Sequence, residues 1–264
     1  MAELHIIFLR HGFSIANLTK QTSFIGVLRD HGGSLRFSQS VKNSCCRDAS
    51  LTMVGKRQGR AAGGRLSKVF DPLIRLHKEE VFSSGLTRTI QTAVEFIDGY
   101  NEYQQQFTKR ITPLPYISEQ RIRWWCCCAD LDNQVQNIDT IREAVQRGDI
   151  EIEPIRPLDD PTSLPWRKPN VRMFQTQVIP VLGERIGQAN AVIVVSHKKT
   201  IAKITGKTLE NGEMVVQTFN RFSGEKMGPP RMIQGQQAHE TTLGVEGRLK
   251  KVLGQHRRVT FYSY

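Results

Sequence analysis

The stretch Leu4-His5-Ile6-Ile7-Phe8-Leu9 leads directly into Arg10-His11-Gly12. Its six residues are too few for a typical helix and apolar enough for a strand that is buried on both faces. Three later runs have the same character, at residues 80–83, 111–117 and 191–195. We therefore expect these four runs to form the centre of a mainly parallel sheet.

Segments with helical character lie between and around these runs. They cover residues 51–69, 87–100, 139–147 and 171–186. Gly99 is expected to end the second of them, and Pro180 to interrupt the last. Because strands that alternate with helices imply crossover connections, the sequence predicts an α/β fold: a three-layer α/β/α sandwich around a mostly parallel sheet. After the turn Glu210-Asn211-Gly212, residues 213–219 are predicted to add an edge strand.

The chain has 264 residues, which suits one large domain better than two small ones. We expect one α/β domain over residues 1–220, followed by a basic C-terminal extension over residues 221–264 that packs on the domain or stays exposed. Residues 18–47 are rich in Gly, Ser and Arg, and residues 149–170 are rich in Pro. Residues 18–47 are therefore predicted to form a long excursion over the edge of the sheet, and residues 149–170 an extended connection.

The chain is basic, with 37 Lys and Arg against 25 Asp and Glu and a formal net charge of +12. Its partners are accordingly expected to be anionic. No DNA-recognition helix, zinc finger or aromatic RNA-binding motif is recognisable, so no specific binding of nucleic acid is expected.

Several features favour an intracellular protein. The first residues lack the pattern of a signal peptide, and no segment has the apolar length of a membrane span. The five cysteines stand at 45–46 and 126–128, a spacing that suits neither a disulfide framework nor a zinc site. We expect the cytoplasm, with the nucleus as an alternative. The run Trp124-Trp125-Cys126-Cys127-Cys128 is interpreted as a partly buried apolar segment, with lipid attachment as the alternative.

Charged and polar side chains follow the predicted strands at the points where they end. Arg10 and His11 follow the first strand, and His197 follows the run 191–195. Arg88 falls in the first turn of the helix that begins after Ser83-Ser84, and Glu119 comes just after the run 111–117. Ligands of open α/β sheets bind at the carboxyl ends of the strands, so these side chains are expected to meet in one pocket.

The order of these motifs is similar to that of the histidine phosphatase superfamily, the phosphoglycerate mutase-like group. The shared residues are Arg10-His11-Gly12 with Asn17, Leu51-Thr52 with Gly55 and Gln58 after Asp48, the run Ser83 to Ala93 with Arg88, and Val195-Ser196-His197. Four motifs in family order over residues 4 to about 220 make the resemblance specific. It implies a phosphoglycerate mutase-like fold with long cap insertions, which residues 18–47 and 120–170 are expected to form as excursions that face the substrate.

The resemblance also implies roles for individual residues. His11 is the nucleophile, and His197 completes the catalytic set together with Glu119 as the general acid. The phosphoryl group is bound by Arg10, Asn17, Arg88 and His197. No metal or cofactor is implied, and the substrate is a phosphorylated small molecule or a phosphoprotein.

Some residues depart from the family pattern. Lys198 and Lys199 follow the late histidine where many relatives have Gly, so Lys198 either narrows the pocket or adds a phosphate contact. Phe13 replaces a residue that is commonly polar, and no stretch similar to Glu-Arg-His-Tyr-Gly is present. Both departures favour a phosphatase over a mutase.

Three functions remain as hypotheses. The first is a metal-independent phosphatase that acts on a phosphomonoester through a phosphohistidine. The second is a catalytically weak binding or scaffolding module, and the third is a mutase-type phosphotransferase. Glu119 is the weakest site assignment, with Glu79, Glu80 and Asp48 as alternative acids. The oligomeric state is open, a homodimer included.

Overall fold

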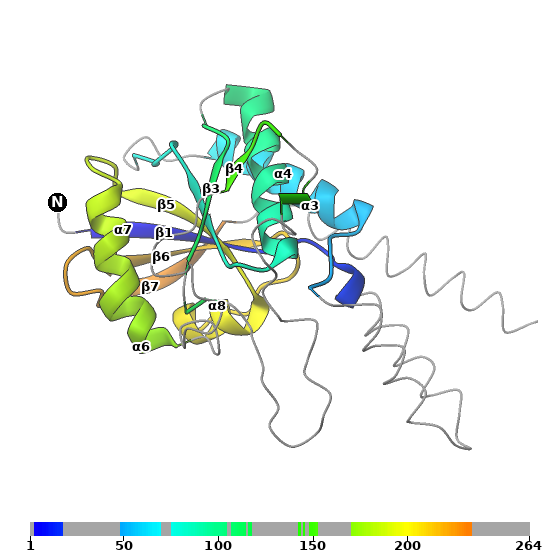
Figure 1. The fold of residues 1–264 in the computed structure, drawn as a ribbon. Helices are drawn as coiled ribbons and strands as arrows, with labels where there is room; N and C mark the ends of the chain where they lie inside the picture. The colour runs from blue at the N-terminus through cyan, green and yellow to red at the C-terminus, as the bar shows by residue number, and fades with distance from the viewer. Residues whose placement is uncertain are drawn as a thin grey trace, which may run out of the picture.

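The opening apolar run becomes β1, an interior strand of the sheet in this computed structural model. Within the described part of the chain the sheet has seven strands in the order β4-β3-β2-β5-β1-β6-β7 (Figure 1). The strands are β1 (Glu3–Arg10), β2 (Val81–Ser83), β3 (Arg110–Pro113), β4 (Glu151–Ile152), β5 (Ala191–Ser196), β6 (Met214–Asn220) and β7 (Lys226–Ile233). Strands β1 to β5 pair in parallel, whereas β6 and β7 are antiparallel. The predicted, mostly parallel sheet is confirmed.

The structure describes the sheet and the helices that cover it. The described residues are 3–17, 48–69, 75–104, 107–114, 116–117, 142–143, 145, 148–152 and 170–233. Glu119, the Trp-Trp-Cys-Cys-Cys run, the excursion 18–47, most of 120–170 and the chain beyond 233 lie outside them. In the described portion, no helix is both long enough and apolar enough to cross a membrane.

Helices cover both faces of the sheet and so make three layers. They are α3 (Met53–Val69), α4 (Thr87–Gln104), α6 (Val171–Met173), the π-helical turn η3 (Phe174–Val178), α7 (Ile179–Arg185) and α8 (Lys198–Thr205). Neighbouring side chains of a strand point to opposite faces. Accordingly, Ile7 of β1 belongs to one core cluster with residues of α3 and α4, and Phe8 belongs to another with residues of η3, α7 and α8. The predicted α/β/α sandwich is confirmed.

The sheet continues one strand further than the sequence suggested. Strand β6 pairs with β1 on one side and with β7 on the other, so it is not the edge strand that was predicted. Strand β7 contains Pro229 and Pro230, which are typical of loops. Proline is rare inside sheets because it cannot donate a backbone hydrogen bond. Prolines are tolerated here because β7 itself lies at the edge of the sheet.

The predicted end of one helix is wrong. Gly99 does not end its helix, since α4 continues to Gln104. A Cβ atom at Gly99 would lie 2.0 Å from the carbonyl oxygen of Arg60, so this glycine allows α3 and α4 to pack closely. Pro180 interrupts the last helix as expected, since a π-helical turn separates α6 from α7, but the helical course of the chain continues through it. In this turn the N–H of Ile179 bonds to the carbonyl of Phe174, five residues back, and the wider turn admits the proline.

The strand register brings three polar segments together at the carboxyl ends of the parallel strands, and this side of the sheet is called the carboxyl edge below. Arg10 pairs with Ser196, and Ser83 with Val195. The N–H of His11 donates to the carbonyl of Ser196 over 3.0 Å, and the N–H of Ser84 donates to the carbonyl of Val195 over 2.9 Å. The residues that follow β1, β2 and β5 therefore leave the sheet at the same level.

Candidate active site

The two predicted histidines meet at the carboxyl edge. The rings of His11 and His197 have centroids 5.2 Å apart, and both side chains are buried. Nδ1 of His11 lies 2.7 Å from the carbonyl oxygen of Gly12. Because a carbonyl can only accept, Nδ1 carries the hydrogen and Nε2 of the neutral ring carries the lone pair.

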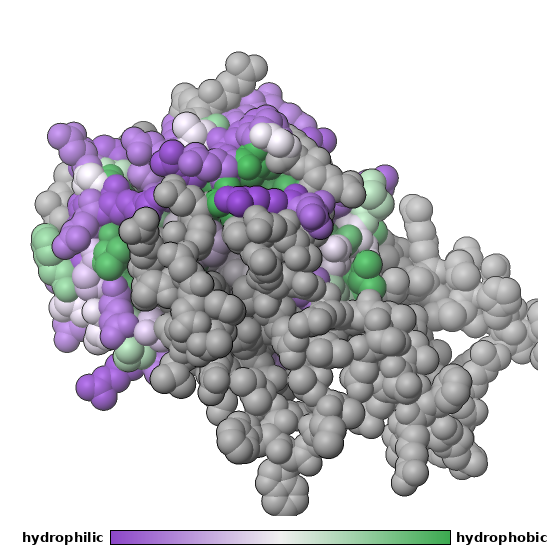
Figure 2. Space-filling view, in the orientation of Figure 1, coloured by the Kyte–Doolittle hydropathy of each residue, from purple (hydrophilic) through white to green (hydrophobic). Residues whose placement is uncertain are grey.

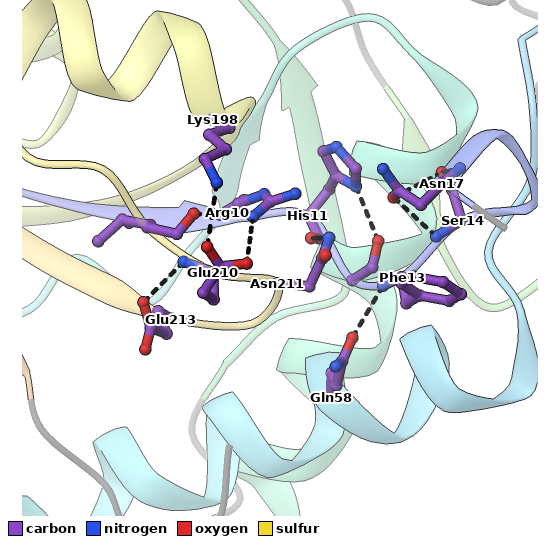
Figure 3. A network of polar contacts seen from close by, with 12 residues as sticks. Arg10, His11, Phe13, Ser14, Asn17, Gln58, Lys198, Glu210, Asn211 and Glu213 are labelled. Atoms are coloured by element: carbon purple, nitrogen blue, oxygen red, sulfur yellow. Dashed lines mark hydrogen bonds and ion pairs between the residues drawn. The ribbon is translucent and has the colours of Figure 1, made fainter. Parts of the chain in front are cut away.

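The loop after β1 is held rigidly by α3 and α4. The N–H of Gly12 donates to Oγ1 of Thr92 over 3.0 Å. The N–H of Phe13 donates to Oε1 of Gln58 over 2.8 Å (Figure 3). Gly55 of α3 lies against this loop so closely that a Cβ atom there would be 2.2 Å from the carbonyl oxygen of Phe13. These contacts give His11 a defined position.

Arg10 is buried beside His11 and points toward the loop that joins α8 to β6. Its Nη1 donates to the carbonyl of Leu209 over 2.8 Å and to Oε2 of Glu210 over 3.2 Å. Nζ of Lys198 donates to Oε1 of the same Glu210 over 3.0 Å (Figure 3). Partial burial works to raise the pKa of Glu210, but its bonds and charge interactions with Lys198 and Arg10 outweigh this and lower the pKa below its ordinary value.

Asp48 fixes the beginning of α4, where Arg88 is buried. Its two carboxylate oxygens each lie 3.0 Å from the N–H of Thr87, and Oδ2 also accepts from the Thr87 hydroxyl over 2.7 Å. Burial raises the pKa of Asp48 to about 6, although the bonds from Thr87 and the charge of Arg88 oppose this rise. Asp48 is thus a cap for the helix that carries Arg88 rather than an acid at the rim.

Asp48→Asn should change how stability depends on pH. The pKa of Asp48 is higher in the folded chain than its ordinary value of 3.8, so the folded state holds the proton more tightly and loses stability as pH rises from about 4 to about 6. We expect the wild type to lose about 2 kcal/mol relative to Asp48→Asn between pH 4 and pH 7. Urea unfolding at both pH values measures this difference. A difference that does not change with pH would contradict the assignment.

His197 is held by residues that follow β2. Its Nε2 is joined to Oγ of Ser84 by a hydrogen bond of 2.7 Å, and Oγ of Ser84 lies 2.9 Å from Oγ1 of Thr89. The sequence assigns Ser84 no role beyond its place in the Ser83 to Ala93 motif. The structure instead places its hydroxyl directly against the second histidine.

The other predicted residues have different placements. Oδ1 of Asn17 accepts from the N–H and the hydroxyl of Ser14, over 3.1 and 3.0 Å, and Figure 3 shows Asn17 on the side of His11 away from Arg10. Glu119 lies outside the described residues. Its alternative Glu80 precedes β2 and bonds to Arg185 over 2.6 Å, so it lies at the opposite end of that strand.

Three site residues were not singled out from the sequence. Nδ2 of Asn211 donates to the carbonyl of His11 over 2.7 Å, Glu210 joins Arg10 to Lys198, and Thr92 holds Gly12. The sequence signal for the first two was the turn Glu210-Asn211-Gly212, which predicts a change of direction and not a contact with the site. Thr92 stood within the Ser83 to Ala93 motif.

The site is rich in basic side chains. Within the residues that the structure covers, no group of three or more His, Cys, Asp and Glu side chains is placed to hold a metal ion. Two imidazoles together with Arg10 and Lys198 form a setting for a phosphoryl or similar oxyanion, because guanidinium and ammonium groups donate charge-assisted hydrogen bonds to such groups.

The motif residues Arg10-His11-Gly12, Gly55 with Gln58, Ser84 to Thr92, and His197 all converge on the carboxyl edge of the sheet. The chain resembles the histidine phosphatase superfamily. No protein-family model matches the sequence, and no curated protein matches it either.

Solved structures similar to this chain include three phosphatases. A mycobacterial glucosyl-3-phosphoglycerate phosphatase has 16% identity and a TM-score of 0.42, and the match covers 87% of this chain and 97% of that one. A phosphoserine phosphatase from Entamoeba histolytica, solved with 3-phosphoglyceric acid, has 17% identity, a TM-score of 0.40 and coverage of 88% and 98%. The protein histidine phosphatase SixA, solved with tungstate, has 11% identity, a TM-score of 0.39 and coverage of 87% and 97%.

Proposed function

We propose that this protein is a phosphatase that hydrolyses a phosphomonoester through a phosphohistidine on His11. The observation that carries the proposal is the bond of 2.7 Å from Nδ1 of His11 to the carbonyl of Gly12. It leaves the lone pair on Nε2, in a ring that is packed against His197 and next to Arg10 in the chain. Such a ring is a nucleophile fixed beside cations that can hold the group it attacks.

The reaction proceeds in two displacements. Nε2 of His11 attacks phosphorus, the bond from phosphorus to the ester oxygen breaks, and the leaving alkoxide takes a proton from the general acid. Water then attacks the phosphohistidine and gives up a proton to the general acid of the first step, which is now ionised and acts as a base. The phosphorus–nitrogen bond breaks, and inorganic phosphate leaves. Arg10, Arg88 and His197 stabilise the charge on the phosphoryl oxygens in both steps.

Glu119 is proposed as the general acid. Glu119→Gln should slow hydrolysis of an alkyl phosphate by about 100-fold, since an alkoxide leaves poorly without a proton. Hydrolysis of p-nitrophenyl phosphate should change much less, because nitrophenolate leaves without one. The measurement is kcat on both substrates. Equal losses on the two substrates would assign Glu119 another role.

A panel of phosphorylated metabolites, inositol phosphates and phosphopeptides tests the function itself. We expect turnover by the wild type in the presence of a chelator, at a rate that does not depend on a bisphosphorylated primer. Activity that requires such a primer would indicate the phosphotransferase instead. Tight binding of phosphate with turnover no faster than that of His11→Ala would indicate the binding module.

A further inference from the structure

We propose that Glu210 is an internal latch whose carboxylate competes with the phosphoryl group for Arg10 and Lys198. The inference rests on the proposed function, which assigns Arg10 to phosphate binding, and it adds Lys198 as a further phosphate contact. Each carboxylate oxygen of Glu210 takes one cation: Oε2 lies 3.2 Å from Nη1 of Arg10, and Oε1 lies 3.0 Å from Nζ of Lys198 (Figure 3). A phosphoryl group presents oxygens to the same donors.

The turn that carries Glu210 is fixed. The backbone N–H of Glu210 donates to Oε2 of Glu213 over 2.7 Å, and the N–H of Gly212 donates to the carbonyl of Arg10 over 3.1 Å. Gly212 has a φ of 77°, the left-handed conformation that favours glycine. The backbone therefore holds Glu210 next to the end of β1 whether or not its side chain stays on Arg10.

The side chain of Glu210 can leave its partners at small cost. It is 54% exposed, whereas that of Arg10 is 8% exposed. Arg10 also keeps a shorter bond, of 2.8 Å, to the buried carbonyl of Leu209. Arg10 would therefore stay in place if the Glu210 carboxylate were removed. For this reason we assign Glu210 the role of a competitor for incoming anions and not that of a residue that positions Arg10.

The latch has a consequence for binding. A phosphate that takes Arg10 and Lys198 must first displace the carboxylate, and the like charges of carboxylate and phosphate then repel each other. Both effects weaken the site for inorganic phosphate, the product of the proposed reaction, and so favour its release. Substitution of Glu210 should accordingly tighten phosphate binding.

The test compares Glu210→Gln with Glu225→Gln in the full chain. Glu225 is an exposed carboxylate in the β6–β7 turn, so its substitution changes the net charge equally without contact with the site. Calorimetry with inorganic phosphate should give a Kd about five- to tenfold lower for Glu210→Gln than for the wild type, and a nearly unchanged Kd for Glu225→Gln. With an aryl substrate, inhibition by phosphate should strengthen by the same factor.

Several results would overturn the latch. A weaker or unchanged Kd for Glu210→Gln would do so, as would an equal gain in Glu225→Gln, which would indicate a general effect of charge. Failure of both the wild type and Glu210→Gln to bind phosphate would also overturn it. The proposed function is judged separately, because turnover that disappears in His11→Ala sustains the phosphatase whatever Glu210 does.

Discussion

His11→Ala is expected to lower kcat/KM for an aryl phosphate by about 10⁴-fold or more, because it removes the atom to which the phosphoryl group is transferred. The buried side chain adjoins Gly12, whose contacts with Thr92 and Gly55 involve the main chain and not the imidazole. The substituted protein should therefore keep its fold. Steady-state kinetics and thermal unfolding measure the two effects.

His5→Ala is the matched control for this substitution. His5 lies on the same strand, five pairs away from the end that carries the site, and its Nδ1 bonds to Oγ1 of Thr218 over 2.9 Å. Its substitution should leave kcat/KM within about twofold of the wild type, as for a change distant from the reacting atoms. Wild-type turnover by His11→Ala, or an equal loss in both proteins, would contradict the assignment of His11.

Gly55→Ala should lower both stability and activity. The added methyl group would lie 2.2 Å from the carbonyl oxygen of Phe13, which is backbone, so the loop that carries His11 must move. We expect the free energy of unfolding to fall by about 2 kcal/mol, even though alanine is favoured over glycine inside a helix by about 1 kcal/mol. Urea unfolding and kcat/KM should decline together.

Gly64→Ala serves as the control on the same helix. A Cβ atom there would lie 2.9 Å from Cε2 of Tyr103, and this ring is largely exposed and can turn aside. Both substitutions gain the same helix propensity, so the difference between them isolates the close approach of α3 to the loop. Similar stabilities and activities for Gly55→Ala and Gly64→Ala would show that this approach is unimportant.

The centre of the fold could be predicted because its strands are buried on both faces. Such strands are apolar throughout, so β1 and β5 are visible in the sequence, and the polar residues that follow them mark the carboxyl edge. Strand β7 could not be predicted, since Gly228 and two prolines hide its pairing with β6. The two residues of β4 are too few for a pattern.

The positions of His11 and His197 could be predicted, but their supports could not. Ser84 contacts His197 from 113 residues away, and Asn211 contacts His11 from 200 residues away. Such partners depend on strand order and register, which no local pattern encodes. An Asn-Gly pattern predicts a turn but not the direction of the neighbouring Glu210 side chain. The capping role of Asp48 could not be predicted either, because it depends on the position of α4 next to residue 48.

Trapping of the phosphorylated protein tests the central claim most directly. The wild type is mixed rapidly with substrate and quenched in alkali, and ³¹P NMR and mass spectrometry then locate the phosphoryl group. Because Nδ1 of His11 is bound to the carbonyl of Gly12, the phosphoryl group should be found on Nε2 of His11 and should be absent from His11→Ala. A phosphoryl group on Nδ1, on His197 or on a serine, or no trapped phosphoprotein during steady turnover, would contradict the mechanism.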